Sequence, residues 1–216
     1  QDLADFAASL AVFGLLNSLS QTVLRLTAPG VPDIYQGNEI WDFSLVDPDN
    51  RRPVDFDHRE RLLSALERRL EEDPDGRARL CAELMDQLAD GRAKLYLIRQ
   101  LLQLRAAQRE VFDHGDYLPL TVDGERAEHV CAFARRRGPV TVIVVTGRWF
   151  ARLQAGDSTE VLPDAVRWGA TRIELPAGCG RLRNIFTGTF ASATTGSLHV
   201  GELLAPLPAA VLIAEG

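Results

Sequence analysis

The chain has 216 residues, 46% hydrophobic and 25% charged, which is ordinary for a globular protein that buries a core without staples. Its formal net charge of −6 at pH 7 argues against a nucleic-acid partner, because surfaces that bind phosphates are basic. Three separated cysteines exclude a disulfide framework and a zinc signature, and they predict buried thiols in a reducing, cytoplasmic compartment.

The start of the chain predicts neither a targeting segment nor a membrane segment. Gln1-Asp2 is not a basic start, no secretory apolar region follows it, and no apolar run approaches the length of a membrane span. Because the first residue is not methionine, we expect either a fragment of a longer protein or a chain whose start has been removed.

A helix is predicted over residues 5–26, where apolar side chains recur at spacings of three and four. Pro29-Gly30 then predicts a turn, and Val31 to Tyr35 predict one short buried strand. Gly37 lets the chain turn sharply again. A buried strand followed by a polar loop is typical of a strand that delivers a site at its C-terminal end.

The loop after this strand carries side chains that suit sugars. Aromatic rings stack on the apolar faces of sugars, and carboxylates, amides and guanidinium groups hydrogen-bond hydroxyls. We expect substrate-binding residues to be Tyr35, Glu39, Trp41, Asp42, Asp49, Asn50, Arg51 and Arg52. Structural alternatives stay open. The charged and amide residues of the loop could only form turns and salt bridges that shape it, Tyr35 could pack in the core or at the rim, and Glu39 could make a structural hydrogen bond.

The same residues carry a family resemblance. The motif Pro-Gly-x-Pro-x-x-Tyr-x-Gly-x-Glu at residues 29–39 resembles the eighth-strand motif of the α-amylase superfamily of (β/α)8 enzymes, glycoside hydrolase family 13. Its extension through residues 41–55, Trp-Asp-Phe-Ser-Leu-Val-Asp-Pro-Asp-Asn-Arg-Arg-Pro-Val-Asp, resembles more narrowly the maltooligosyl trehalose synthase family. The resemblance is strong over the first quarter of the chain and looser beyond it.

The resemblance implies an isomerase of trehalose biosynthesis. Such an intramolecular glucosyltransferase converts the reducing-end α-1,4 linkage of a maltooligosaccharide into an α,α-1,1 trehalose linkage. The family carries its catalytic carboxylates after barrel strands four, five and seven, and this chain begins beyond those positions. We therefore expect no catalytic residue here, only parts of the substrate loop and scaffold that join the rest of the barrel. Asp33 and Glu39 make no substitute pair, because alternation along a strand gives them no reason to converge.

Three further helices are predicted before residue 110. The first opens at Asp57, which has capping-box spacing to Glu60, and ends at residues 73–76, Asp-Pro-Asp-Gly. The second is centred on residues 80–88, and the third, with a wide apolar face, runs from about Arg92 to Arg109. The resemblance implies that the first two form a small insertion and that the third is the last barrel helix.

Short β-rich runs replace helical spacing near Val111. Candidate strands are His129–Ala134, Pro139–Thr146, Thr171–Leu175, Leu182–Phe186, Ser197–Val200 and Ala209–Ala214. The second is apolar on both faces, which predicts an interior strand. The run Arg135-Arg136-Arg137 precedes Gly138-Pro139 and predicts a solvated hairpin tip. Trp149 and Trp168 are expected in the core or at an edge, with a sugar-binding platform as the alternative.

These observations predict an α+β multidomain chain. Residues 1–110 are expected to form the C-terminal end of a (β/α)8 barrel, mostly helical here, and residues 111–216 an antiparallel β-sandwich. Two other functions stay open: a non-catalytic carbohydrate-binding or scaffold module, and part of an α-amylase-type hydrolase. No cofactor and no metal are expected, because the histidines are scattered and Asp47-x-Asp49 lacks the glycine and glutamate of a calcium loop.

Overall fold

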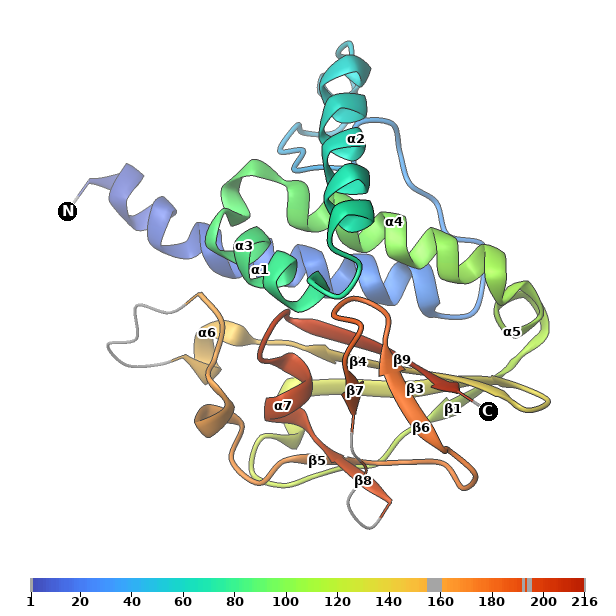
Figure 1. The fold of residues 1–216 in the computed structure, drawn as a ribbon. Coiled ribbons are helices and arrows are strands. Elements are labelled where there is room, and N and C mark those ends of the chain that lie inside the picture. Colours follow the sequence, from blue (N-terminus) through green and yellow to red (C-terminus); the bar gives the residue numbers. More distant parts are fainter. Residues whose placement is uncertain (1, 155–160, 192, 194–195, 216) are drawn as a thin grey trace.

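The computed structural model describes every residue except 1, 155–160, 192, 194–195 and 216 (Figure 1). Its helices and 3₁₀ turns are α1 (Leu3–Thr27), η1 (Asp49–Arg51), α2 (Phe56–Glu72), α3 (Arg77–Asp86), η2 (Leu88–Asp90), α4 (Arg92–Ala107), α5 (Arg109–His114), η3 (Ala127–His129), α6 (Phe150–Leu153), η4 (Ala165–Trp168) and α7 (Val200–Leu204). Its strands are β1 (Asp116–Pro119), β2 (Val122–Asp123), β3 (Val130–Arg137), β4 (Val140–Gly147), β5 (Arg172–Glu174), β6 (Arg181–Asn184), β7 (Phe190–Ala191), β8 (Ser197–His199) and β9 (Ala209–Glu215).

The strands form two antiparallel sheets. The larger has six strands in the order β1-β3-β4-β9-β6-β7, and the smaller has the order β2-β5-β8. Strand β4 lies between β3 and β9, with Val144 opposite Phe133 on one side and Val211 on the other. All three side chains are buried. The predicted interior strand is therefore confirmed, because only a strand with neighbours on both edges can bury both apolar faces.

Helices α1 and α4 pack side by side across one face of the six-stranded sheet, and the smaller sheet lies on the opposite side (Figure 1). The apolar stripe of α1, Leu16, Leu19, Val23 and Leu26, is completely buried against α4 and the sheet. Burial of each such side chain contributes about 1.5–3 kcal/mol, so this stripe fixes α1 on the sheet. The predicted helix is confirmed, and its end sets where the polar loop begins.

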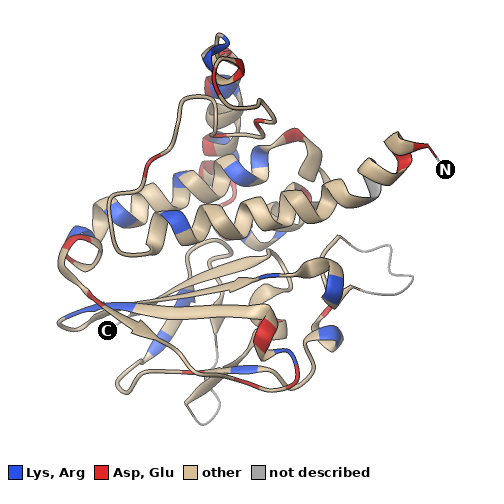
Figure 2. Ribbon diagram, turned by 180° about the vertical axis from the view of Figure 1, so that it is seen from behind, with Lys and Arg blue, Asp and Glu red and all other residues tan. Residues whose placement is uncertain are grey.

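The expectation that no apolar run approaches the length of a membrane span is wrong. By length and composition, helix α1 is apolar enough to cross a membrane. Figure 2 shows it almost free of charged residues outside its acidic start. Core helices and signal sequences pass the same test, and the second half of α1 packs against α4 and β4. At its start, Leu3, Phe6 and Leu10 are exposed on one face.

The predicted strand Val31 to Tyr35 is wrong. These residues have no regular secondary structure, and Val31 is 97% exposed. All strands of the described residues lie beyond residue 115, so nothing pairs with this segment. An extended run without a neighbour has no ladder partner for its amides and carbonyls. The part of the chain that was expected to end a barrel is thus helical, and Asp33 is exposed.

Arg135 is a second correction. The hairpin between β3 and β4 turns at Gly138 as expected, and Arg137 is exposed. Arg135, however, is only 2% exposed and points into the layer between sheet and helices. Its guanidinium donates to the carbonyl oxygens of Thr27 at 3.2 Å, Val111 at 3.2 Å, Phe112 at 3.0 Å and Gly115 at 3.1 Å. One buried cation therefore satisfies the last carbonyls of both α1 and α5.

Helix boundaries also shift. Asp55, not Asp57, caps α2, because its carboxylate accepts the amide of His58 at 2.8 Å. The predicted third helix ends at Ala107, and α5 follows as a separate turn. Strands β1, β2 and β7 were not predicted.

Of the tryptophans and cysteines expected to be buried, only some are buried. Trp168 is completely buried, as expected, whereas Trp149 is 44% exposed. Of the three free cysteines, only Cys81 is buried; Cys131 and Cys179 are half-buried.

Candidate functional site

The polar loop between α1 and α2 is held in place by side chains from the helices beside it. Trp41 donates its indole N–H to the carbonyl of Leu88 at 2.7 Å, and Lys94 Nζ donates to the carbonyl of Ile40 at 3.2 Å. Gly91, at the start of α4, has φ +81°, and a Cβ there would lie 2.8 Å from that of Ile40. Glycine is needed at this position both for its backbone conformation and for the close approach.

Arg59, in the first turn of α2, makes a second anchor. Its guanidinium donates to the carbonyl of Gly37 at 2.7 Å and to the carboxylate of Glu39 at 3.0 Å. It also donates to the carbonyl of Asp55, the cap of α2, at 3.0 Å. Gly37 has φ +90°, a conformation that L side chains rarely adopt. Residues 37–41 of the loop are therefore fixed to the start of α2 and to the η2–α4 region.

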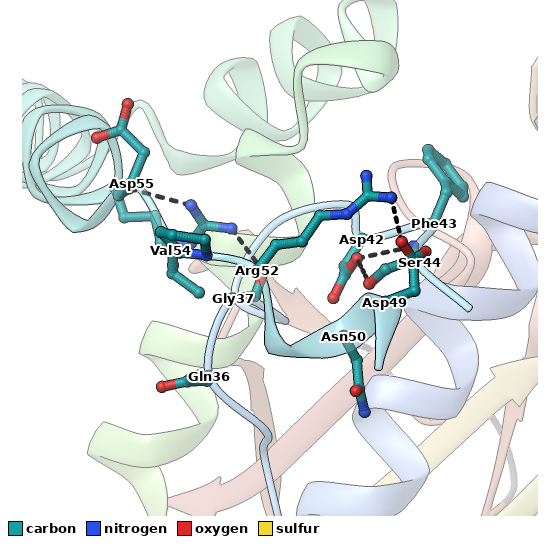
Figure 3. Close-up of a pocket in the computed structure, with 12 residues that line it drawn as sticks. Gln36, Gly37, Asp42, Phe43, Ser44, Asp49, Asn50, Arg52, Val54 and Asp55 are labelled. Atoms are coloured by element: carbon teal, nitrogen blue, oxygen red, sulfur yellow. Dashed lines mark hydrogen bonds and ion pairs between the residues drawn. The ribbon is translucent and has the colours of Figure 1, made fainter. Parts of the chain in front are cut away.

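Between these anchors the loop encloses an open cavity of about 410 Å³. Its volume lies in the range of small-molecule sites, about 300–1,000 Å³. The lining residues are Gln36, Gly37, Asp42, Phe43, Ser44, Asp49, Asn50, Arg52, Pro53, Val54, Asp55 and Arg59. Figure 3 shows Asp42, Ser44 and Asp49 gathered near the tip of Arg52. Polar groups thus converge on one side of the cavity, while Phe43 offers an exposed ring.

Asp42 is held as an ionised acceptor. Its carboxylate accepts the amide of Ser44 at 2.9 Å and the Ser44 hydroxyl, and Asn38 Nδ2 lies 3.4 Å away. The hydrogen bonds from Ser44 lower the pKa of Asp42 below its usual value, with smaller help from the charges of Lys94 and Arg59. An ionised carboxylate with free lone pairs accepts hydrogen bonds from ligand hydroxyls.

The 3₁₀ turn η1 presents the other polar groups. Asp49 accepts the amide of Leu45 at 2.7 Å and pairs with Arg52. The amide oxygen of Asn50 is buried and has no hydrogen-bond partner among the described residues. An unsatisfied buried acceptor costs about 1–3 kcal/mol.

The structure brings together half of the eight residues predicted for this site. Asp42, Asp49, Asn50 and Arg52 line the cavity. The other four, Tyr35, Glu39, Trp41 and Arg51, are not among the lining residues.

Those four have contacts of another kind. Glu39 pairs with Arg59, which is the structural alternative left open for it. Trp41 donates to the carbonyl of Leu88, a contact that was not predicted. Tyr35 is 45% exposed, and Arg51 pairs with Asp47 outside the cavity. Arg52, which follows η1 in an extended conformation, lines the cavity and pairs with Asp49, whereas Arg51 does not line it.

Arg59 is the main lining residue that sequence reasoning missed. Its position four residues after the Asp55 cap places it on the helix face that turns back toward the loop. Gln36, Ser44 and Asp55 also line the cavity. Among the residues that the structure describes, no group of three or more His, Cys, Asp or Glu side chains is placed to hold a metal.

Comparison with known proteins shows which proteins this chain resembles. No protein-family model matches the chain. It is 35% identical over 214 residues to two Mycobacterium tuberculosis proteins that are provisionally named maltooligosyl trehalose synthase. The match covers 99% of this chain and 22% of each relative, so the chain spans about a fifth of the length of those curated relatives.

Solved structures agree with this match. The maltooligosyltrehalose synthase of Arthrobacter ramosus superposes with a TM-score of 0.73 at 33% identity, over 99% of this chain and 24% of that one. An α-amylase from Anoxybacillus, at 16% identity and a TM-score of 0.54, covers 92% of this chain and 32% of its own and shares the fold alone. Over 99% of its length, the chain is therefore similar to a segment of the maltooligosyl trehalose synthases.

Proposed function

We propose that this chain is the C-terminal part of a trehalose-forming intramolecular glucosyltransferase, whose substrate is a maltooligosaccharide. The observation that carries the proposal is similarity to the synthases along 99% of the chain. The cavity beside η1 then supplies part of the substrate site. The reactive carboxylates belong to the rest of the parent barrel, which is the partner of this chain.

The chemistry of the cavity suits a sugar ring. Ionised Asp42 accepts hydroxyl hydrogen bonds, Asn50 offers a buried unpaired oxygen, and Arg52 donates. The exposed Phe43 ring offers an apolar face on which a sugar stacks. These groups bind and orient. They surround a sugar on a surface that is open in this chain, which a neighbouring part of the barrel would close against water.

The carboxylates of the cavity are occupied in ways that do not suit catalysis. A general acid for glycosidic cleavage needs a raised pKa, whereas the pKa of Asp42 is lowered. Asp49 is bonded to Leu45 and Arg52, and Asp55 caps α2. This supports a role in holding substrate, with nucleophile and acid supplied from outside the chain.

Exposed apolar side chains support the presence of further protein around residues 3–46. On α1, Leu3 is 78% exposed and Phe6 58% exposed, and in the loop Phe43 and Val46 are 81% and 83% exposed. Large apolar side chains left exposed, here at the start of α1 and in the loop, are typical of surfaces that another protein segment covers. The remainder of the parent barrel is the occupant that the synthase relatives indicate.

The test is a chimaera. In the Arthrobacter ramosus synthase, the matching 24% is replaced by this chain, and products from maltopentaose are separated. We expect trehalosyl ends, and Arg52→Ala to raise KM or the share of hydrolysis by about tenfold, the value of one charge-assisted hydrogen bond. Arg51→Ala removes the same charge outside the cavity and is the matched control.

Two results would count against the proposal. Release of free glucose and maltose without trehalosyl ends would indicate an α-amylase-type hydrolase. Equal effects of Arg52→Ala and Arg51→Ala would indicate that the cavity does not bind the substrate.

A further inference from the structure

A second cavity, of about 350 Å³, lies between α1 and α4 and shares no lining residue with the first. Its wall is made of Ser18, Gln21, Thr22, Arg25, Asn38 and Lys94. The loop 36–44 borders both cavities, since Asn38 lines this one whereas Gly37 and Asp42 line the other.

Helix α1 turns a polar stripe toward this cavity. Ser18, Gln21, Thr22 and Arg25 follow one another at spacings of three, one and three, which places them on one face of the helix. The rest of α1 is mostly apolar, and the opposite stripe is buried in the core. Thr22 is only 3% exposed and donates its hydroxyl to the carbonyl of Ser18 at 2.8 Å within the helix. The groups of the stripe that can meet a ligand are therefore those of Ser18, Gln21 and Arg25.

Lys94 is the one lysine of the chain and is only 5% exposed. Its ammonium donates to the carbonyl of Ile40 at 3.2 Å and lies 5.7 Å from the centre of the Trp41 ring. An ammonium has three N–H donors, so one carbonyl leaves donor capacity. Burial, followed by repulsion from Arg25, lowers the pKa of Lys94 to about 8.

The charges of this cavity are uncompensated within its own wall. No carboxylate is among its lining residues. Arg25 takes part in none of the ion pairs found among the described residues. Asp42 and Glu39 attract the Lys94 ammonium from outside the wall, but their effect is smaller than that of burial and Arg25. Two like charges that share a cavity are stabilised by an anion between them.

We infer that this cavity binds a small organic oxyanion, with Lys94 and Arg25 holding its charged group. Its volume exceeds that of a bare ion, and Ser18, Gln21 and Asn38 offer hydrogen bonds to hydroxyls on the rest of the ligand. The ligand class is a phosphorylated or carboxylated polyhydroxy compound.

The test uses the single lysine of the 216-residue chain. Protein labelled with ¹³C-lysine gives one Cε resonance, whose pH titration reports the pKa of Lys94 without modification. Titrations are run with inorganic phosphate, with glucose 1-phosphate and with glucose, at constant ionic strength set by chloride, because screening alone weakens the repulsion from Arg25. Bound oxyanion raises the pKa of Lys94 by about one unit.

Variants locate the effect. Arg25→Gln is expected to weaken phosphate binding at least tenfold, whereas Arg137→Gln, on the exposed β3–β4 hairpin, leaves it unchanged. Tighter binding of glucose 1-phosphate than of phosphate shows that the hydroxyl-bonding wall is used, and equal binding limits the site to the oxyanion. No pKa shift with either phosphate, or an equal shift with glucose or with Arg25→Gln, overturns the inference.

Discussion

Replacement of Arg135 by alanine tests whether one buried guanidinium joins the helices to the sheet. Its four carbonyl partners end α1 and α5, and Val111 O also accepts the Gly115 amide at 3.0 Å. Alanine leaves two or three carbonyls unsatisfied, at about 1–3 kcal/mol each. Part of this is offset, because burial opposes the charge of Arg135, which lowers its pKa. We expect a net loss of about 3 kcal/mol in the free energy of unfolding.

Urea unfolding followed by circular dichroism measures this loss, and a thermal melt should fall by about 10 °C for a chain of this size. Arg137→Ala is the matched control from the same arginine run. Its side chain is exposed, so its change should stay within about 0.5 kcal/mol. Equal losses for the two variants would refute the reasoning, because they would indicate that Arg135 and Arg137 have the same environment, as on a solvated hairpin tip. Arg135→Lys should recover only part of the stability, since an ammonium has three donors for four carbonyls.

Three further outcomes are expected. Leu16→Ala should cost about 2–5 kcal/mol of unfolding free energy in urea, because Leu16 is completely buried, whereas Leu3→Ala, at 78% exposure, should change it little. Tyr96→Phe should cost about 1–2 kcal/mol in the same assay, since it removes the hydroxyl that donates to the carbonyl of Phe186 at 2.5 Å. Lys94 has a pKa of about 8 in the fold against the ordinary lysine value of 10.5, so the unfolded chain binds more protons between these two pH values. The stability of the wild type relative to Lys94→Met should therefore rise between pH 8 and 10.5, and a pH-independent difference would contradict this.

The helices were predictable because their signal is local. The stripe of α1 recurs at three and four residues, and Gly76 and Gly91 mark where α3 and α4 begin. Strand β4 was equally predictable, since its sequence places apolar side chains on both faces of the strand. In each case the neighbours in sequence are the neighbours in space, so periodicity reports the buried face directly.

The candidate site was half predictable. The loop composition pointed to Asp42, Asp49, Asn50 and Arg52, which line the cavity. Arg59 could not be found in this way, because it comes from the next helix and reaches back across the chain to Gly37. The second cavity was not foreseen for the same reason, since Arg25 and Lys94 meet only when α1 packs beside α4.

The sequence by itself determined helices α1 to α4, the interior position of β4 and the polar character of the loop, because each depends on residues close together in the chain. Tertiary structure alone decided that residues 31–35 have no strand partner and that Arg135, in a run of three arginines, is buried. Both outcomes depend on what lies opposite in space: a strand needs a neighbour for its amides, and a cation leaves water only where carbonyls converge on it.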